Sequence, residues 1–230
     1  MSNRLTLTTW NVNSVRLRVE LLKMLTEAPL HDGEMNRGPD VLCLQETKAM
    51  DDVFPRDAVL ALGYSHLLIK GMKGYNGVAI ASRFPLTPID APDWCAKGDC
   101  RHLAARIDTP GQSIELHNFY VPAGGPVPDR TKNPKFAHKL DFVTAMREWF
   151  TTARKQSDRI VLCGDLNIAP GEHDVWSHSI CRRSSRIHRS KLNTCKPCNL
   201  VSTGPMPCAI SFRQIKSFLV GGLIVPRIGA

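Results

Sequence analysis

The chain of 230 residues is 43% hydrophobic and 22% charged, proportions that are ordinary for a globular protein and exclude a collagen, a coiled coil or wholesale disorder. Length alone predicts one large domain or two small ones. The charge is uneven: residues 1–178 hold 21 basic and 21 acidic residues, whereas residues 179–230 hold nine basic residues and no acidic one, so the net charge of +9 comes from the second part.

Strand and helix patterns alternate along residues 1–178, which predicts an α/β or α+β domain. The first helix is expected to begin at Ser14 as its N-cap and to bury one apolar face. In chain order the predicted elements are a strand at Leu5–Trp10, a helix at Val15–Glu27, a strand at Asp40–Gln45, a short helix at Val53–Leu62, strands at His66–Ile69 and Val78–Ser82, a hairpin of His102–Ile107 with Ser113–Tyr120, a long helix at Pro134–Gln156 and a strand at Arg159–Cys163.

Polar side chains stand directly after several of these strands. Asn11 follows the first strand, Glu46 the second and Tyr120 the hairpin, while Asp165 and Asn167 follow the last strand. Because chemistry in layered α/β folds gathers where strand ends converge, a carboxylate at such a position is expected to be a metal ligand or a base. For any one of them alone, a turn residue or a helix N-cap is the better interpretation, but the occurrence of several in one chain weakens it.

Five short segments occur in a characteristic order and spacing, namely TWNVNS at 9–14, CLQETK at 43–48, YNGVAI at 75–80, NFYVP at 118–122 and GDLN at 164–167. Together they resemble the exodeoxyribonuclease III family, the bacterial abasic-site endonucleases of the endonuclease/exonuclease/phosphatase superfamily. Each segment by itself is a weak signal, whereas the ordered set is a strong one. The resemblance covers about residues 3–178.

The resemblance implies an α/β (α+β) four-layer sandwich, in which two packed mixed β-sheets are flanked by helices and the C-terminus is incomplete. It implies Mg²⁺-dependent hydrolysis, with Mn²⁺ as an alternative ion, of phosphodiesters in double-stranded DNA at abasic sites and from 3′ ends. The protein is then expected to be a cytoplasmic monomer with no membrane partner.

The resemblance also implies a role for each matching residue. Glu46 would bind the metal, and Asn11 would help position the metal and the phosphate. Tyr120 would contact the scissile phosphate, Asp165 would orient or deprotonate the attacking water, and Asn167 would hold the phosphate and that aspartate. The residues implied to bind substrate are Arg101, Asn118 and Lys48.

This chemistry is coherent without the resemblance, because phosphodiester hydrolysis needs a positioned water, a base and neutralisation of charge on the phosphoryl oxygens. Residues 1–178 have no net charge, so affinity for DNA would have to come from a local basic face. A solvated surface is an equally good interpretation of each member of that face. Its candidate members are Lys48, Lys70, Lys73, Arg101, Lys132 and Lys135.

The cysteines and the N-terminal sequence indicate the compartment. The opening MSNRLTLTTWN lacks the apolar core of a secretory signal, and no apolar run approaches the ~18–20 residues that span a bilayer. Cys43, Cys95, Cys100 and Cys163 are therefore expected to be free thiols in a reducing cytoplasm. The pair Cys195 and Cys198 has no second pair at zinc-ribbon spacing, which argues against structural zinc.

The resemblance ends after residues 175–178, where the family continues with a helix, a tryptophan-containing segment that faces DNA and a late Asp-His pair. In a shifted reading frame, synonymous codons permit strings that resemble those segments, in order, from Arg183 to Leu192, from Met206 to Ser211 and from Val220 to Ala230. We therefore predict that residues 1–178 form an incomplete nuclease domain. Residues 179–230 are predicted to be an out-of-frame tail with little regular structure, so catalysis by the chain as written is expected to be impaired.

Two other functions stay open. One is a non-catalytic remnant that binds DNA or metal, and the other is a phosphodiesterase of another branch of the superfamily, acting on lipids or inositol phosphates. The segments Gln45–Lys48 and Tyr75–Ile80 favour the DNA branch, since kinship of fold alone would not discriminate between them.

Overall fold

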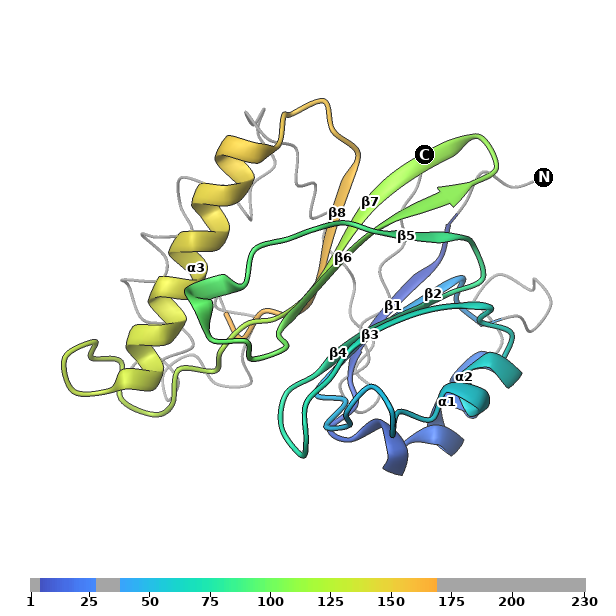
Figure 1. Ribbon diagram of the computed structural model, residues 1–230, viewed down its shortest axis with the longest axis horizontal. Coiled ribbons are helices and arrows are strands. Elements are labelled where there is room, and N and C mark those ends of the chain that lie inside the picture. The colour runs from blue at the N-terminus through green and yellow to red at the C-terminus, as the bar shows by residue number, and fades with distance from the viewer. Residues whose placement is uncertain (1–4, 28–37, 169–230) are drawn as a thin grey trace, which may run out of the picture.

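The computed structural model describes residues 5–27 and 38–168, which form two four-stranded mixed β-sheets (Figure 1). The first sheet has the order β1 (Leu7–Asn11), β2 (Val41–Gln45), β4 (Val78–Ser82) and β3 (His66–Lys70). The second has the order β5 (Leu86–Pro88), β6 (His102–Thr109), β7 (Gln112–Tyr120) and β8 (Ile160–Asp165). The predicted fold class, two mixed sheets with helices, is confirmed.

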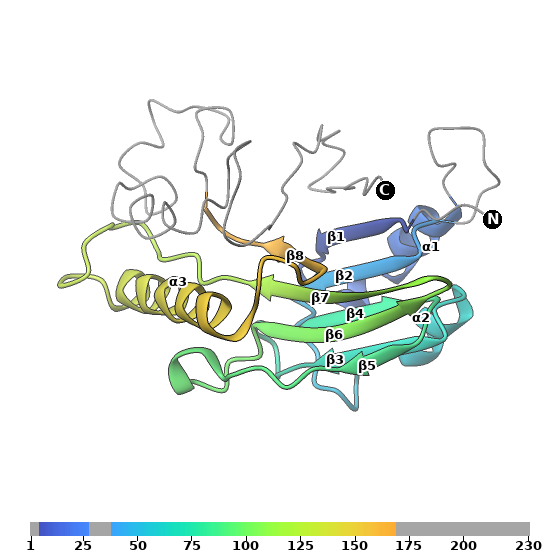
Figure 2. The same ribbon diagram turned by 90° about the horizontal axis from the view of Figure 1, so that it is seen from above.

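Helices cover the outer faces of both sheets (Figures 1 and 2). The 3₁₀ turn η1 (Val15–Leu17) with α1 (Val19–Glu27) and α2 (Arg56–Ala61) packs on the first sheet, and the 3₁₀ turn η2 (Trp94–Ala96) with α3 (Pro134–Ala153) packs on the second. The described residues therefore form four layers, with helices outside and the two sheets inside.

Alternation along the strands supplies the three apolar cores of this sandwich. In β2, Val41 and Cys43 point into the core between the sheets, whereas Leu42 and Leu44 point into the core beneath α1 and α2. All five residues of β2 are buried, as expected of a strand that is covered on both faces. Aromatic residues dominate the third core, where Phe119 of β7 packs beneath α3.

The two sheets share one pairing pattern. In the first sheet β1 runs parallel to β2, with Asn11 opposite Gln45, and β2 runs antiparallel to β4. In the second sheet β8 runs parallel to β7, with Asp165 opposite Tyr120, and β7 runs antiparallel to β6. Each sheet thus brings the carboxyl ends of two neighbouring strands to one edge.

The predicted helix Val15–Glu27 is divided, and Ser14 is not a side-chain cap. Ser14 has a φ of 86°, and its backbone N–H donates to the Glu46 carbonyl over 2.7 Å. That backbone bond fixes the turn that follows β1, so a 3₁₀ turn forms first and α1 begins only at Val19. The predicted face is otherwise confirmed, because Val15 and Leu22 are fully buried.

Other boundaries shift for local reasons. The short helix begins at Arg56 instead of Val53, because Pro55 stands at its N-cap and a proline disfavours helical backbone in the residue before it. The long helix begins at Pro134 as predicted and ends at Ala153, three residues early. The sequence analysis missed β5 and η2, which are only three residues long each.

Two expectations concern composition and membranes. Cys43, Cys95, Cys100 and Cys163 are all free thiols, and Cys43 and Cys163 are buried between the sheets. None of the helices within residues 5–27 and 38–168 has the length and apolar character that a membrane crossing requires. The predicted tail at residues 179–230, with its cysteine pair, lies outside the described residues, so its frame change and its lack of structure stay predictions.

Candidate active site

Four of the predicted site residues meet where the parallel strand pairs of the two sheets end. The Asn11 amide Nδ2 donates to Glu46 Oε1 over 2.9 Å and to Asp165 Oδ2 over 2.9 Å. The Tyr120 hydroxyl donates to the same Glu46 Oε1 over 2.8 Å. The cluster thus joins both sheets, and one amide group bridges its two carboxylates.

The Glu46 carboxylate is held in its charged form. Partial burial raises its pKa, but hydrogen bonds from Asn11 and Tyr120 and the ammonium of Lys48 outweigh that effect, so the pKa lies below the ordinary 4.5. Lys48 Nζ lies 3.0 Å from Glu46 Oε2, and it also donates a hydrogen bond to Asn13 Oδ1. Glu46 is therefore an anion at neutral pH, with N–H and O–H donors on Oε1 and the Lys48 ammonium beside Oε2.

Tyr120 is a neutral hydrogen-bond donor in this cluster. Burial raises the pKa of its phenol above the ordinary 10, and the charge of the Glu46 carboxylate raises it further. The guanidinium of Arg101 lies over the Tyr120 ring, 4.7 Å from its centroid. The ring is thus fixed from one side by a cation and through its hydroxyl by an anion.

Arg101 is buried beside this cluster. Its side chain is only 6% exposed and pairs through Nε with the Asp99 carboxylate over 2.5 Å. It also donates to the Tyr120 carbonyl over 3.3 Å and to the Tyr75 hydroxyl over 3.5 Å. Predicted as a substrate-binding residue, Arg101 acts in this structure on the orientation of Tyr120.

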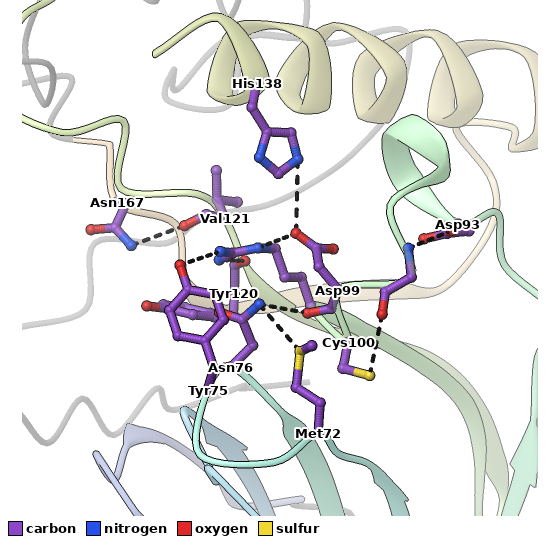
Figure 3. Close-up of polar contacts among 12 residues, drawn as sticks. Met72, Tyr75, Asn76, Asp93, Asp99, Cys100, Tyr120, Val121, His138 and Asn167 are labelled. Atoms are coloured by element: carbon purple, nitrogen blue, oxygen red, sulfur yellow. Dashed lines mark hydrogen bonds and ion pairs between the residues drawn. The ribbon is translucent and has the colours of Figure 1, made fainter. Parts of the chain in front are cut away.

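Asp165 is fixed through both carboxylate oxygens. Oδ2 accepts from Asn11, and Oδ1 accepts from the backbone N–H of Asn167 over 3.1 Å. Asn167 in turn donates from Nδ2 to the Val121 carbonyl over 2.9 Å, as Figure 3 shows. The predicted link between Asn167 and the aspartate is therefore present, although it runs through the Asn167 backbone.

Asn118 does not join the cluster. Its side chain is fully buried between the sheets, where Nδ2 donates to the carbonyls of Leu44 and Ala79 and Oδ1 accepts from Gln45 Nε2 over 2.6 Å. The structure gives this residue no exposed surface for the substrate contact that the resemblance implies. Its amide group instead ties β7 of the second sheet to β2 and β4 of the first.

The backbone around the cluster adopts conformations that side chains disfavour. Asn13, Glu46, Lys48 and Asn167 have φ values of 43°, 52°, 50° and 49°. Such left-handed residues persist only where the surrounding structure over-determines them, and they gather at functional sites. Sequence reasoning missed Asn13, for which its place two residues after Asn11 was the available signal.

Lys139 was also missed, and its position in α3 was a usable signal. It lies three residues after Phe136 and four before Val143 on a face that is otherwise buried and apolar. A lysine on such a face needs hydrogen-bond partners, because burying its charge is otherwise costly.

The donor set suits a hard divalent cation. Mg²⁺ is usually held by one or two carboxylates, with water and substrate phosphate supplying the remaining ligands. Glu46 and Asp165 provide carboxylate oxygens that already attract the Lys48 ammonium and the Asn11 N–H groups. Within the described part of the chain no group of three His, Cys, Asp or Glu side chains is close enough to hold a metal ion by itself.

Comparison with known proteins agrees with the fold and with the five segments. The class that this fold and site define is a two-sheet α/β sandwich with paired carboxylates at its strand ends. The sequence profile of the Endonuclease/Exonuclease/phosphatase family matches residues 8–216, and the chain belongs to this family. The resemblance inferred from the five segments is confirmed at that level. The matched interval runs past residue 178, and the break predicted there stays a prediction.

Three relatives illustrate the similarity. Exodeoxyribonuclease III of Haemophilus influenzae is 29% identical over 175 residues, which are 72% of this chain and 58% of that protein. An AP endonuclease of Archaeoglobus fulgidus has a TM-score of 0.70 and 30% identity over 84% of this chain and 68% of its own. A Neisseria 3′ phosphatase bound to a product DNA hairpin has a TM-score of 0.67 and 30% identity, over 84% of this chain and 69% of its own. The chain thus spans little more than half the length of the Haemophilus relative.

Proposed function

We propose that this protein is a DNA-repair nuclease, which hydrolyses phosphodiesters of double-stranded DNA at abasic sites and from 3′ ends with Mg²⁺ or Mn²⁺. The observation that carries the proposal is the Asn11 amide, which joins the carboxylates of Glu46 and Asp165 at 2.9 Å each. This contact sets two acids from different sheets side by side, as a hydrolytic site for a phosphodiester requires. The names of the relatives supply the substrate class.

Each residue has a proposed part in the reaction. Glu46 holds the cation, which when bound neutralises charge on the phosphoryl oxygens. Asp165, with its oxygens fixed by Asn11 and Asn167, orients the attacking water and accepts its proton. Tyr120 remains protonated, so its hydroxyl can donate to a phosphate oxygen once Glu46 is engaged elsewhere.

Contacts with the DNA backbone are proposed for exposed basic residues near the site. Lys48 is partly exposed beside Glu46, and Lys73 and Lys135 are exposed. Phosphate contacts of this kind give affinity that falls steeply with added salt. A monomeric state and a cytoplasmic location remain predictions, as does the impairment of the chain as written.

The proposal is tested by cleavage of a duplex that carries one abasic site, with Mg²⁺ and with a chelator. Two chains are compared: the chain as written, and the product of the same gene with the shifted frame restored after codon 178. We expect metal-dependent cleavage by both, faster in the second. Each acid variant has a matched control at an exposed acid outside the cluster, Glu148→Gln for Glu46 and Asp57→Asn for Asp165.

The outcomes separate the alternatives. If neither chain cleaves the abasic duplex, the proposed function is wrong. Duplex binding without cleavage would favour the non-catalytic remnant, and hydrolysis of an inositol phosphate instead of DNA would favour the other branch. The nucleotide sequence around codon 178 tests the frame change separately.

A further inference from the structure

Lys139 is the most unusual charged residue of the described chain. Its side chain is fully buried in the second turn of α3, among residues that pack against the second sheet. Burying an ammonium group is costly unless hydrogen bonds compensate for the lost water. Its contacts therefore indicate what the charge is kept for.

The ammonium binds two backbone carbonyls. Lys139 Nζ donates to the carbonyl of Ala123 over 3.0 Å and to that of Asn167 over 2.5 Å. Ala123 lies in the segment that leaves β7 just after Tyr120, and Asn167 lies in the segment that leaves β8 just after Asp165. One cation on α3 thus joins the two segments that follow the second sheet's site residues.

Asn167 is the point where these bonds converge. Its C=O accepts from Lys139, its Nδ2 donates to the Val121 carbonyl and its N–H donates to Asp165 Oδ1. The same residue has a φ of 49°, a left-handed conformation that asparagine adopts more readily than most residues, although less freely than glycine. Three hydrogen bonds therefore hold this left-handed residue in the conformation that directs its N–H at the Asp165 carboxylate. Figure 3 draws the one to Val121.

We propose that Lys139 is a positioning residue for the hydrolytic site, which fixes Asn167 and through it the orientation of the Asp165 carboxylate. This inference rests on the proposed function, because it assigns Asp165 as the base. Lys139 does not touch the substrate. Its effect is on the geometry of the reacting groups and so falls on the chemical step, where a displacement of about 1 Å can cost on the order of 10²-fold in rate.

The test replaces the ammonium with an uncharged group of similar length, Lys139→Met, in the full chain. Steady-state cleavage of the abasic duplex is expected to show kcat reduced on the order of 10²-fold with KM within about twofold of the unmodified chain. Amide hydrogen exchange, followed by mass spectrometry, is expected to be faster in peptides covering residues 121–125 and 164–168.

The matched control is Phe150→Leu, about three turns further along the same helix. Phe150 is buried in the aromatic core beneath α3, so its truncation destabilises the same layer without touching Ala123 or Asn167. We expect Phe150→Leu to lower the melting temperature comparably and to leave kcat and the exchange of the two peptides unchanged. Equal kcat losses in the two variants, or unchanged exchange in Lys139→Met, would overturn the assignment.

Two provisions keep the test decisive. If Lys139→Met does not fold, the test uses Lys139→Gln, which keeps an N–H donor on a shorter side chain. Its kcat is expected to fall and its two peptides to exchange faster, both by less than in Lys139→Met. Unaltered kcat and exchange in Lys139→Gln would refute the role. If the unmodified chain cleaves nothing, the proposed function fails by itself. The exchange comparison with Phe150→Leu then decides whether Lys139 fixes the Asn167 segment.

Discussion

The first sheet presents its site carboxylate from a turn, whereas the second presents its carboxylate from the last residue of a strand. Glu46 follows β2 in a left-handed conformation, and its position depends on the backbone bonds that Ser14 and Lys48 make around it. Asp165 closes β8 in register with Tyr120 of β7. The difference teaches that the strand ladder places the Asp165 carboxylate, whereas the backbone bonds of a turn and the side chains of Asn11 and Tyr120 place that of Glu46.

The largest expected effect is that of Asp165→Asn, which removes the rigidly held acid. Cleavage of the abasic duplex should fall by between about 10² and 10⁴-fold, because a positioned base typically contributes that much. Binding of uncleaved duplex, measured by fluorescence anisotropy, should be retained. A lower melting temperature with activity falling only in step with the folded fraction would identify Asp165 as a structural cap instead.

Glu46→Gln tests the carboxylate that the first sheet contributes to the site. With its metal ligand made neutral, activity at limiting Mg²⁺ should fall by roughly 10²–10³-fold, since the cation's charge stabilisation is worth several kcal/mol. A titration of rate against Mg²⁺ concentration measures this. Glu148→Gln is the control, and an unchanged Mg²⁺ dependence of Glu46→Gln would exclude Glu46 as the ligand.

Asn118→Ala should weaken the link between the sheets without affecting the substrate. Its loss removes the amide donor to the buried carbonyls of Leu44 and Ala79 and one of the acceptors of the Gln45 amide, which should lower the free energy of unfolding by about 3 kcal/mol. Urea denaturation measures that change. KM for the abasic duplex should stay as it was, and a raised KM with normal stability would restore the implied substrate contact.

Tyr120→Phe removes one hydrogen bond that joins the two halves. Because a hydrogen bond to a charged group contributes about 1.5–3 kcal/mol, kcat/KM should fall by between about 10-fold and about 150-fold. The lost donor also raises the pKa of Glu46, so the acid limb of the pH–rate profile should move to higher pH. An unshifted acid limb would mean that the Tyr120 hydroxyl does not influence Glu46 in solution.

The smallest effect concerns stability and pH in the second sheet. Burial lowers the pKa of His102 well below 6.5, and burial also lowers the pKa of His117. His102 Nε2 lies 3.0 Å from His117 Nδ1. The unfolded chain then binds protons that the folded chain does not, so the free energy of unfolding should decrease as pH falls below about 6.5, by about 1 kcal/mol by pH 6.0. Urea midpoints across this range measure it, and the decline should be weaker in His102→Gln.

Sequence reasoning predicted the strands well, because their apolar alternation and the five segments fix both their position and their order. It also placed Asn11, Glu46, Tyr120 and Asp165 at one site, since all four stand at the end of a strand or directly after it. It did not predict that Arg101 is buried or that Asn118 lies between the sheets, because burial depends on which side of a strand faces the partner sheet.

Position 164, directly before Asp165, can accept only glycine. Its φ is 124°, and a Cβ atom added there would lie 1.9 Å from the Phe119 carbonyl oxygen of the neighbouring strand. Any side chain would have to push β7 and β8 apart at the pair Phe119–Gly164, which directly precedes the pair Tyr120–Asp165. The distance between the Tyr120 hydroxyl and the Asp165 carboxylate therefore depends on the absence of a Cβ atom at position 164. A library of variants at this position should return only glycine among active clones.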